Sequence, residues 1–128
     1  MHLHALTLVV DDYDRAIDYY VGILGFALHE DTALGNGKRW VLVSPNVDGG
    51  ACLLLAEATT DRQRKAVGNQ TGGRVGFFLH TDDFDNDYAR LVAAGVRMTE
   101  TPRSEAYGKV VVFADLYGNL WDLIEPVS

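Results

Sequence analysis

The stretch Asp11-Asp12-Tyr13-Asp14 recurs as Asp82-Asp83-Phe84-Asp85, 71 positions later in the chain (82 − 11). Each copy follows an apolar run typical of a strand, at 3–10 and at 74–81. Each copy is followed by apolar residues at helical spacing, and the helical pattern ends at a glycine, Gly25 or Gly95. The repeated strand and helix predict an internal duplication.

Further strands complete each copy. After the strand that follows each glycine, we expect strands at 39–44 and 51–57 in the first half and at 109–114 and 120–125 in the second. The polar stretch between the halves has room for a short helix at about 61–67. The pattern predicts one domain, 1–128, with an α+β fold of two tandem β-α-β-β-β modules. Module 1 is expected at about 1–57, the linker at about 58–73 and module 2 at about 74–128.

The paired aspartates allow two interpretations, a metal site or helix caps. They stand where a helix begins, and there Asp accepts hydrogen bonds from free backbone amides and faces the positive end of the helix dipole. We therefore expect a structural role for them.

Composition narrows the class of protein. The chain has 128 residues, a formal net charge of −7 and one cysteine, Cys52. The negative charge argues against nucleic acid or an anionic membrane as partner. The single thiol, which cannot form an internal disulfide, favours a cytoplasmic protein, and no apolar run approaches the length of a membrane span.

Two longer runs carry a family resemblance. The run Val9 to Phe26, with its Asp-Asp-Tyr-Asp start, and the closing run Phe113 to Glu125 closely resemble the vicinal oxygen chelate superfamily. That family includes glyoxalase I, extradiol dioxygenases, fosfomycin-resistance enzymes and bleomycin-resistance proteins. The resemblance implies a curved, cup-shaped mixed sheet and a homodimer, which would also cover the open sheet edges.

The resemblance also implies a divalent metal in the cup, the default cofactor of the family's enzymes. Its ligand positions fall here on Ala5, Leu54, Gly76 and Asp122, of which only Asp122 carries a donor. His4 neighbours the first position, but strand alternation places it on the opposite face, with Leu8. No metal and no other cofactor is therefore expected, because a catalytic site usually needs about three protein ligands.

Several other side chains are expected around the cup. The candidate ligand-binding residues are Trp40, Phe78, His80, Arg103, Glu105, Tyr107 and Asp122. His80, Glu105 and Tyr107 are also the candidate catalytic residues. Each has a structural alternative: His80 as a hydrogen-bonded strand-end histidine, Arg103 and Glu105 as a surface pair, and the aromatic residues as core. Asp122 needs a partner, which could be a cationic ligand, His80 or an arginine from another strand.

The leading hypothesis is a binding protein similar in kind to the bleomycin-resistance proteins. Its ligand would be a small, neutral or cationic, partly aromatic molecule held without a metal. The alternative is a lyase, isomerase or dioxygenase of the same superfamily, working with a metal on non-standard ligands or with His80 or Glu105 as general base. A dimeric scaffold with a vestigial cup is the third possibility.

Overall fold

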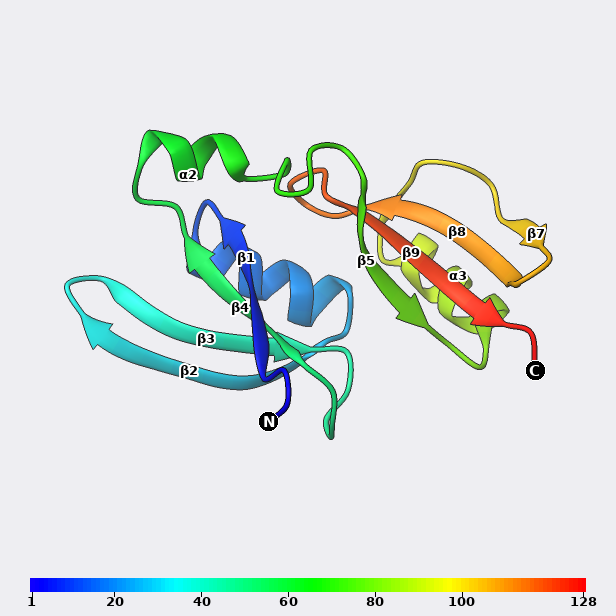
Figure 1. Cartoon of the computed structure of the whole chain (residues 1–128), viewed down its shortest axis with the longest axis horizontal. Coiled ribbons are helices and arrows are strands. Elements are labelled where there is room, and N and C mark those ends of the chain that lie inside the picture. The colour runs from blue at the N-terminus through cyan, green and yellow to red at the C-terminus, as the bar shows by residue number, and fades with distance from the viewer. The chain divides into compact units, whose positions relative to one another are not determined.

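The first half of the chain forms a four-stranded sheet (Figure 1). The computed structural model describes residues 1–128 and divides the chain into two units, Met1–Gly68 and Asn69–Ser128. The first unit contains, in order, β1 (Ala5–Val10), α1 (Tyr13–Ile17), the π-helical segment η1 (Asp18–Ile23), β2 (Ala27–Gly35), β3 (Lys38–Ser44), β4 (Cys52–Glu57) and α2 (Asp61–Ala66). The strand order is β1-β4-β3-β2, with β1 parallel to β4 and the other pairs antiparallel.

The second unit repeats this plan. It contains, in order, β5 (Val75–His80), α3 (Phe84–Ala93), β6 (Arg97–Met98), β7 (Arg103–Glu105), β8 (Gly108–Ala114) and β9 (Leu120–Pro126). The strand order is β5-β9-β8-β6, β7 also pairs with β8, and β5 is parallel to β9. The predicted α+β fold of two mixed sheets is confirmed, and so is the short helix between them, α2.

One element differs from the expected pattern. The strand after the helix is continuous in the first unit, β2, but is split into β6 and β7 in the second. Pro102 lies in the gap, and a proline has no backbone N–H with which to continue the ladder. The split strand lets β7 begin at Arg103, one of the candidate site residues.

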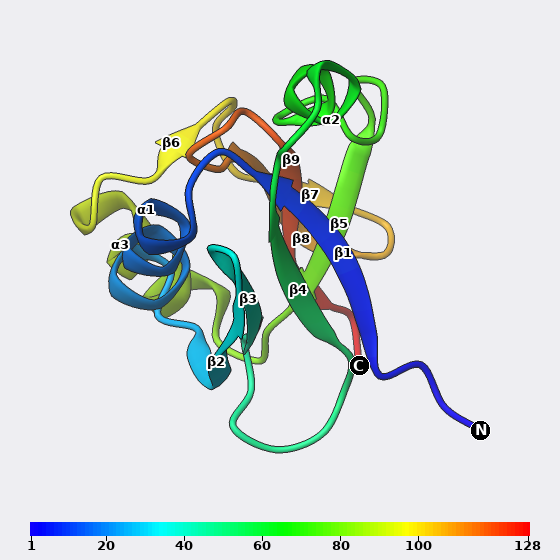
Figure 2. The ribbon, with the colours of Figure 1, turned by 90° about the vertical axis from the view of Figure 1, so that its left-hand side faces the viewer.

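The two faces of the first sheet have different roles. Leu8 and Val10 of β1 and Leu55 of β4 are fully buried on one face, together with Ala16 and Tyr20 from the helical segment. Figure 2 shows α1 against one side of this sheet. The opposite face, with alternate residues of the same strands, is therefore left free of the helix.

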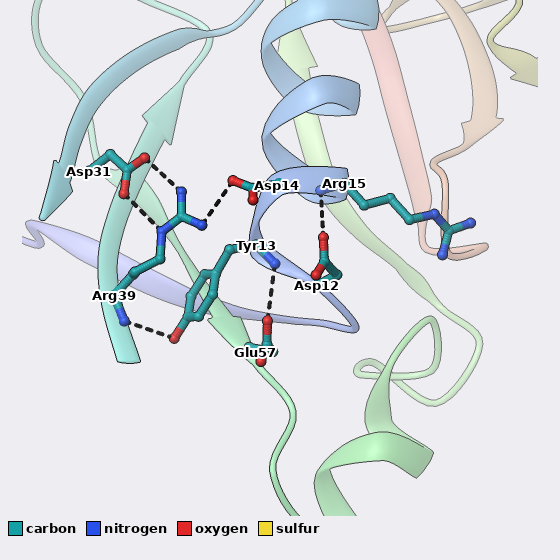
Figure 3. Close-up of polar contacts among 7 residues, drawn as sticks. All are labelled: Asp12, Tyr13, Asp14, Arg15, Asp31, Arg39 and Glu57. Carbon is teal, nitrogen blue, oxygen red and sulfur yellow. Dashed lines mark hydrogen bonds and ion pairs between the residues drawn. The ribbon is translucent and has the colours of Figure 1, made fainter. Parts of the chain in front are cut away.

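The start of α1 is tied to the sheet by polar contacts (Figure 3). The backbone N–H of Tyr13 donates to Oε2 of Glu57 on β4 at 3.2 Å. The guanidinium of Arg39 on β3 donates to Asp14 at 2.8 Å and lies 5.2 Å from the centroid of the Tyr13 ring. We name Tyr13, Asp14, Arg39 and Glu57 the Tyr13 clasp.

The second unit contains the same arrangement from equivalent residues. The backbone N–H of Phe84 donates to Oε1 of Glu125 on β9 at 2.8 Å. The Lys109 ammonium on β8 lies 2.9 Å from Asp85 and 5.5 Å from the centroid of the Phe84 ring. These four residues form the Phe84 clasp, and its existence supports the duplication more strongly than the motif alone.

One aspartate of each motif caps its helix, and Asp11 pairs with Arg15. Asp12 accepts a hydrogen bond from the backbone N–H of Arg15 at 2.8 Å, and Asp83 accepts one from Asn86 at 3.4 Å. The predicted structural role is confirmed. No helix in the structure is long and apolar enough to cross a membrane.

Candidate functional site

A hollow of about 750 Å³ lies in the first unit, at the end of the sheet where β1 and β4 end and β3 begins, and Tyr13 of α1 and Gln63 of α2 also line it. Thr7 and Val9 of β1 line it together with four consecutive residues of β4, Leu54 to Glu57. The turn between β2 and β3, residues 34–38, forms another part of the wall. The hollow is therefore built on regular strands, and most of its floor is apolar.

Trp40 of β3 supplies the aromatic wall of this hollow. Its side chain is 37% exposed, whereas Trp121, the other tryptophan, is 2% exposed in the core of the second unit. An exposed indole beside an apolar floor can stack on a flat ligand. The expectation that Trp40 lines a binding surface agrees with this geometry.

The polar end of the hollow is the Tyr13 clasp, which Figure 3 shows with the residues that surround it. Arg39 forks onto Asp31 at 2.7 and 3.1 Å in addition to its contact with Asp14. Hydrogen bonds to Asp31 and then Asp14 raise the pKa of Arg39 above its ordinary value, and the hydrogen bond from Arg39 lowers the pKa of Asp31. Because Arg39 is committed to two carboxylates, its guanidinium is not free to pair with an anionic ligand.

The corresponding face of the second unit carries Asp122. In the sheet ladder Asp122 lies opposite Phe78 of β5 on one side and Val112 of β8 on the other. In the first unit the equivalent row is Thr7, Leu54 and Leu42, so Asp122 stands where Leu54 lines the hollow. Phe78 is 62% exposed, which is unusual for a phenylalanine in a sheet.

The Asp122 carboxyl lacks hydrogen-bond partners for its buried oxygen. Its Oδ1 atom is buried and has no hydrogen-bond partner. Burial raises the pKa of Asp122, the positive charge of Arg103 opposes that rise, and the negative charge of Glu100 adds to it. A carboxyl with a perturbed pKa on an open sheet face is a candidate binding group.

Arg103, Glu105 and Tyr107 are brought together, as the sequence predicted for this segment. The guanidinium of Arg103 donates to Glu100 at 2.7 Å and to Glu105 at 2.9 Å, and it lies 3.5 Å from the Tyr107 hydroxyl. These contacts hold the pKa of Arg103 above its usual value. The surface-pair alternative for Arg103 and Glu105 is therefore realised, although the group lies close enough to Asp122 to affect its titration.

His80 ends β5 on the same face as Phe78, two residues further along the strand. Its side chain is exposed and makes no hydrogen bond within the chain. The alternative of a hydrogen-bonded strand-end histidine does not hold, and the imidazole is free to meet a ligand.

Some contributing residues escaped the sequence analysis. Glu57 and Glu125, which hold the helix starts, could have been found because each stands at the end of the last strand of its module. Nothing in the sequence pointed to Thr71. Its side chain lies beside Gly76, where a Cβ on residue 76 would come within 2.6 Å of Cγ2 of Thr71.

The resemblance implies metal ligands at Ala5, Leu54, Gly76 and Asp122. Ala5 and Leu54 carry no donor atom, and Thr71 fills the place beside Gly76. Within either unit no group of three or more His, Cys, Asp or Glu side chains is placed to hold a metal ion.

Comparison with known proteins agrees with this architecture. The chain is 52% identical over 121 residues to a protein of Shewanella frigidimarina, covering 94% of this chain and 90% of the relative. The crystal structure of UcmS2 superposes with a TM-score of 0.84 at 27% identity and covers 98% of both chains. TnmS3, an antibiotic binding protein from Streptomyces sp. CB03234, superposes with a TM-score of 0.79 at 31% identity, covering 99% of this chain and 97% of TnmS3. The profile of one family matches residues 2–123, and the chain belongs to that family, the glyoxalase/bleomycin resistance protein/dioxygenase superfamily.

Proposed function

We propose that the protein binds a small, partly aromatic, neutral or cationic molecule without a metal. The observation that carries the proposal is the hollow of about 750 Å³ in the first unit, lined by the apolar side chains of Val9, Leu54 and Ala56 and by the exposed indole of Trp40. A volume of this order is typical of small-molecule sites, which are mostly apolar with a few placed polar groups. The similarity to TnmS3 supports a binding role.

Metal-free binding is proposed because of what stands at the family's ligand positions. Ala5 and Leu54 stand at the two ligand positions of the first unit, and both side chains are apolar. Both residues belong to the sheet that lines the hollow. An apolar floor favours contact with a ring system over coordination of a cation. We also propose a homodimer, since β1 and β5 each have one neighbour in their sheet and leave an edge to be covered. A cytoplasmic location is proposed from the single cysteine, Cys52.

Trp40 provides a direct test. A ligand stacked in the hollow will change the fluorescence of the half-exposed Trp40, while the buried Trp121 contributes a constant background. A screen of planar aromatic compounds against the purified, untagged protein should give saturable changes that disappear in Trp40→Phe. Calorimetry on that variant then measures the affinity lost. Saturable binding that needs stoichiometric divalent metal, measured by mass spectrometry, would contradict the metal-free proposal.

One observation favours an enzyme as the second candidate. The free His80 imidazole lies on the same face as Phe78 and could act as a general base. An enzyme of this kind would convert the bound compound, and its pH–rate profile would lose one limb in His80→Ala. Unchanged compound after long incubation with the protein argues for the binding role alone.

A further inference from the structure

The carboxyl of Asp122 lacks the partner that a buried polar group ordinarily has. Its Oδ1 atom is buried without a hydrogen bond, while the residue as a whole is half-buried and can be reached from outside. Buried side-chain oxygens are paired in the great majority of cases, and an unpaired one destabilises the folded state. A ligand that brings positive charge to this carboxyl would supply the missing compensation.

The nearest cation cannot supply it. Arg103 acts on Asp122 through its charge, but its guanidinium already donates to Glu100 and Glu105. Glu100 and Glu105 contact this guanidinium and Asp122 interacts with it through charge, so with Asp122 ionised these four groups carry a net charge of two negative units. That excess attracts a cation and repels an anion.

The neighbour of Asp122 in the sheet is an aromatic ring available to solvent. Phe78 lies directly opposite Asp122 in the parallel ladder, so both side chains point to the same face, a few ångströms apart. Phe78 is 62% exposed. A cation beside the ring face gains a cation–π contribution, and an aromatic ligand can stack on the ring.

We infer that this face of the second unit selects an aromatic amine, with its ammonium group at the Asp122 carboxylate and its ring against Phe78. The inference rests on the proposed function, the binding of small aromatic molecules, and names the class of ligand that the face of the second unit takes. Asp122 then acts as the residue that determines specificity. It stands at the family's metal position but binds the ligand's own charge.

The other groups on this face decide how binding varies with pH. Val112 of β8 is apolar, and the charged or titratable side chains near Asp122 are Arg103, Glu105, Glu100, Tyr107 and His80. Ionisation of Asp122 as the pH rises strengthens amine binding. The variant Asp122→Asn removes this dependence on pH.

The experiment uses matched pairs of planar aromatics, each as the primary amine and as the alcohol, starting with 1-naphthylmethylamine and 1-naphthylmethanol. Affinities are measured by calorimetry for the wild-type chain, for Asp122→Asn and for Asp48→Asn. Asp48 is exposed on a loop of the first unit, so its variant removes the same charge without touching the Asp122 face. Thermal unfolding shows that each variant is folded.

Amines are expected to bind the wild type about ten- to a hundredfold more tightly than the matched alcohols, the range of a charge-assisted hydrogen bond. Asp122→Asn should abolish that ratio and leave the alcohols unchanged, while Asp48→Asn should keep it. Equal binding of amines and alcohols to the wild type would overturn the inference and leave the proposed function standing. If neither series binds at all, both fail together.

Discussion

Arg39 and Lys109 occupy equivalent places in the two clasps, but Arg39 has more partners. Both cations lie over the aromatic ring that begins a helix, at 5.2 and 5.5 Å, and both pair with the aspartate that follows it. Arg39 also forks onto Asp31, whose side chain is 32% exposed, compared with 82% for Asp85, the partner of Lys109. The duplication therefore provides a matched pair of substitutions, Arg39→Ala and Lys109→Ala.

The difference between the two variants can be worked out from these contacts. An exposed pair such as Lys109–Asp85 contributes between 0 and ~1 kcal/mol, and a cation over a ring at an exposed site adds ~0.5 kcal/mol. The bidentate fork of Arg39 on Asp31 is better ordered and adds ~1 kcal/mol, with packing of the arginine stem as a smaller contribution. Arg39→Ala should then lower the free energy of unfolding by about 2 kcal/mol and Lys109→Ala by about 1 kcal/mol.

Thermal unfolding followed by circular dichroism measures both variants under the same conditions. With a shift of about 4 °C per kcal/mol for a chain of this size, Arg39→Ala should melt about 8 °C below the wild type and Lys109→Ala about 4 °C below it. High salt should narrow the gap, since screening weakens the exposed pairs. A Lys109→Ala loss equal to or greater than that of Arg39→Ala would refute the reasoning, because the fork on Asp31 would then contribute nothing.

Further substitutions test other parts of the structure. Tyr13→Phe removes the hydroxyl that accepts the Arg39 backbone N–H at 3.2 Å and should destabilise the fold by ~1 kcal/mol, measured by urea denaturation; no loss would show that water replaces the bond. Gly108→Ala puts a Cβ 2.2 Å from the carbonyl oxygen of Glu125 and should destabilise by about 3 kcal/mol, while the control Gly22→Ala meets nothing within 4 Å and should be near neutral in the same assay. Asp122→Asn tests the raised pKa of Asp122, which burial causes in the folded state. The protonated carboxyl stabilises the fold fully at a pH below the pKa that Asp122 has in the unfolded chain. That stability is lost as the pH rises through the pKa of the folded state. The melting temperature of Asp122→Asn relative to the wild type should therefore increase from about pH 4 to about pH 7, and a constant or falling difference would contradict the raised pKa.

The fold could be predicted because the residues that specify it are repeated. Asp12 and Asp83 cap helices in the same way, and the two clasps join each helix start to its sheet. Such contacts are local and depend on residue type and spacing, both of which are visible in a sequence. The split of β6 from β7 was missed because one proline, Pro102, outweighed the pattern of the surrounding residues.

The candidate site was less predictable, because it lies where the two modules differ. Thr7 of the first module is equivalent to Phe78 of the second, and Leu54 is equivalent to Asp122. The repeat that reveals the fold therefore carries no information about these side chains. Strand alternation still predicts which face they share, and Phe78 and Asp122 do lie opposite each other in the ladder. Strand alternation does not predict whether a charged side chain such as Asp122 has a hydrogen-bond or ion-pair partner. The guanidinium of Arg103 donates to Glu100 and Glu105, and strand alternation predicts neither contact. The candidate site residues are therefore ones at which the two modules differ, and the choice of ligand should be sought there.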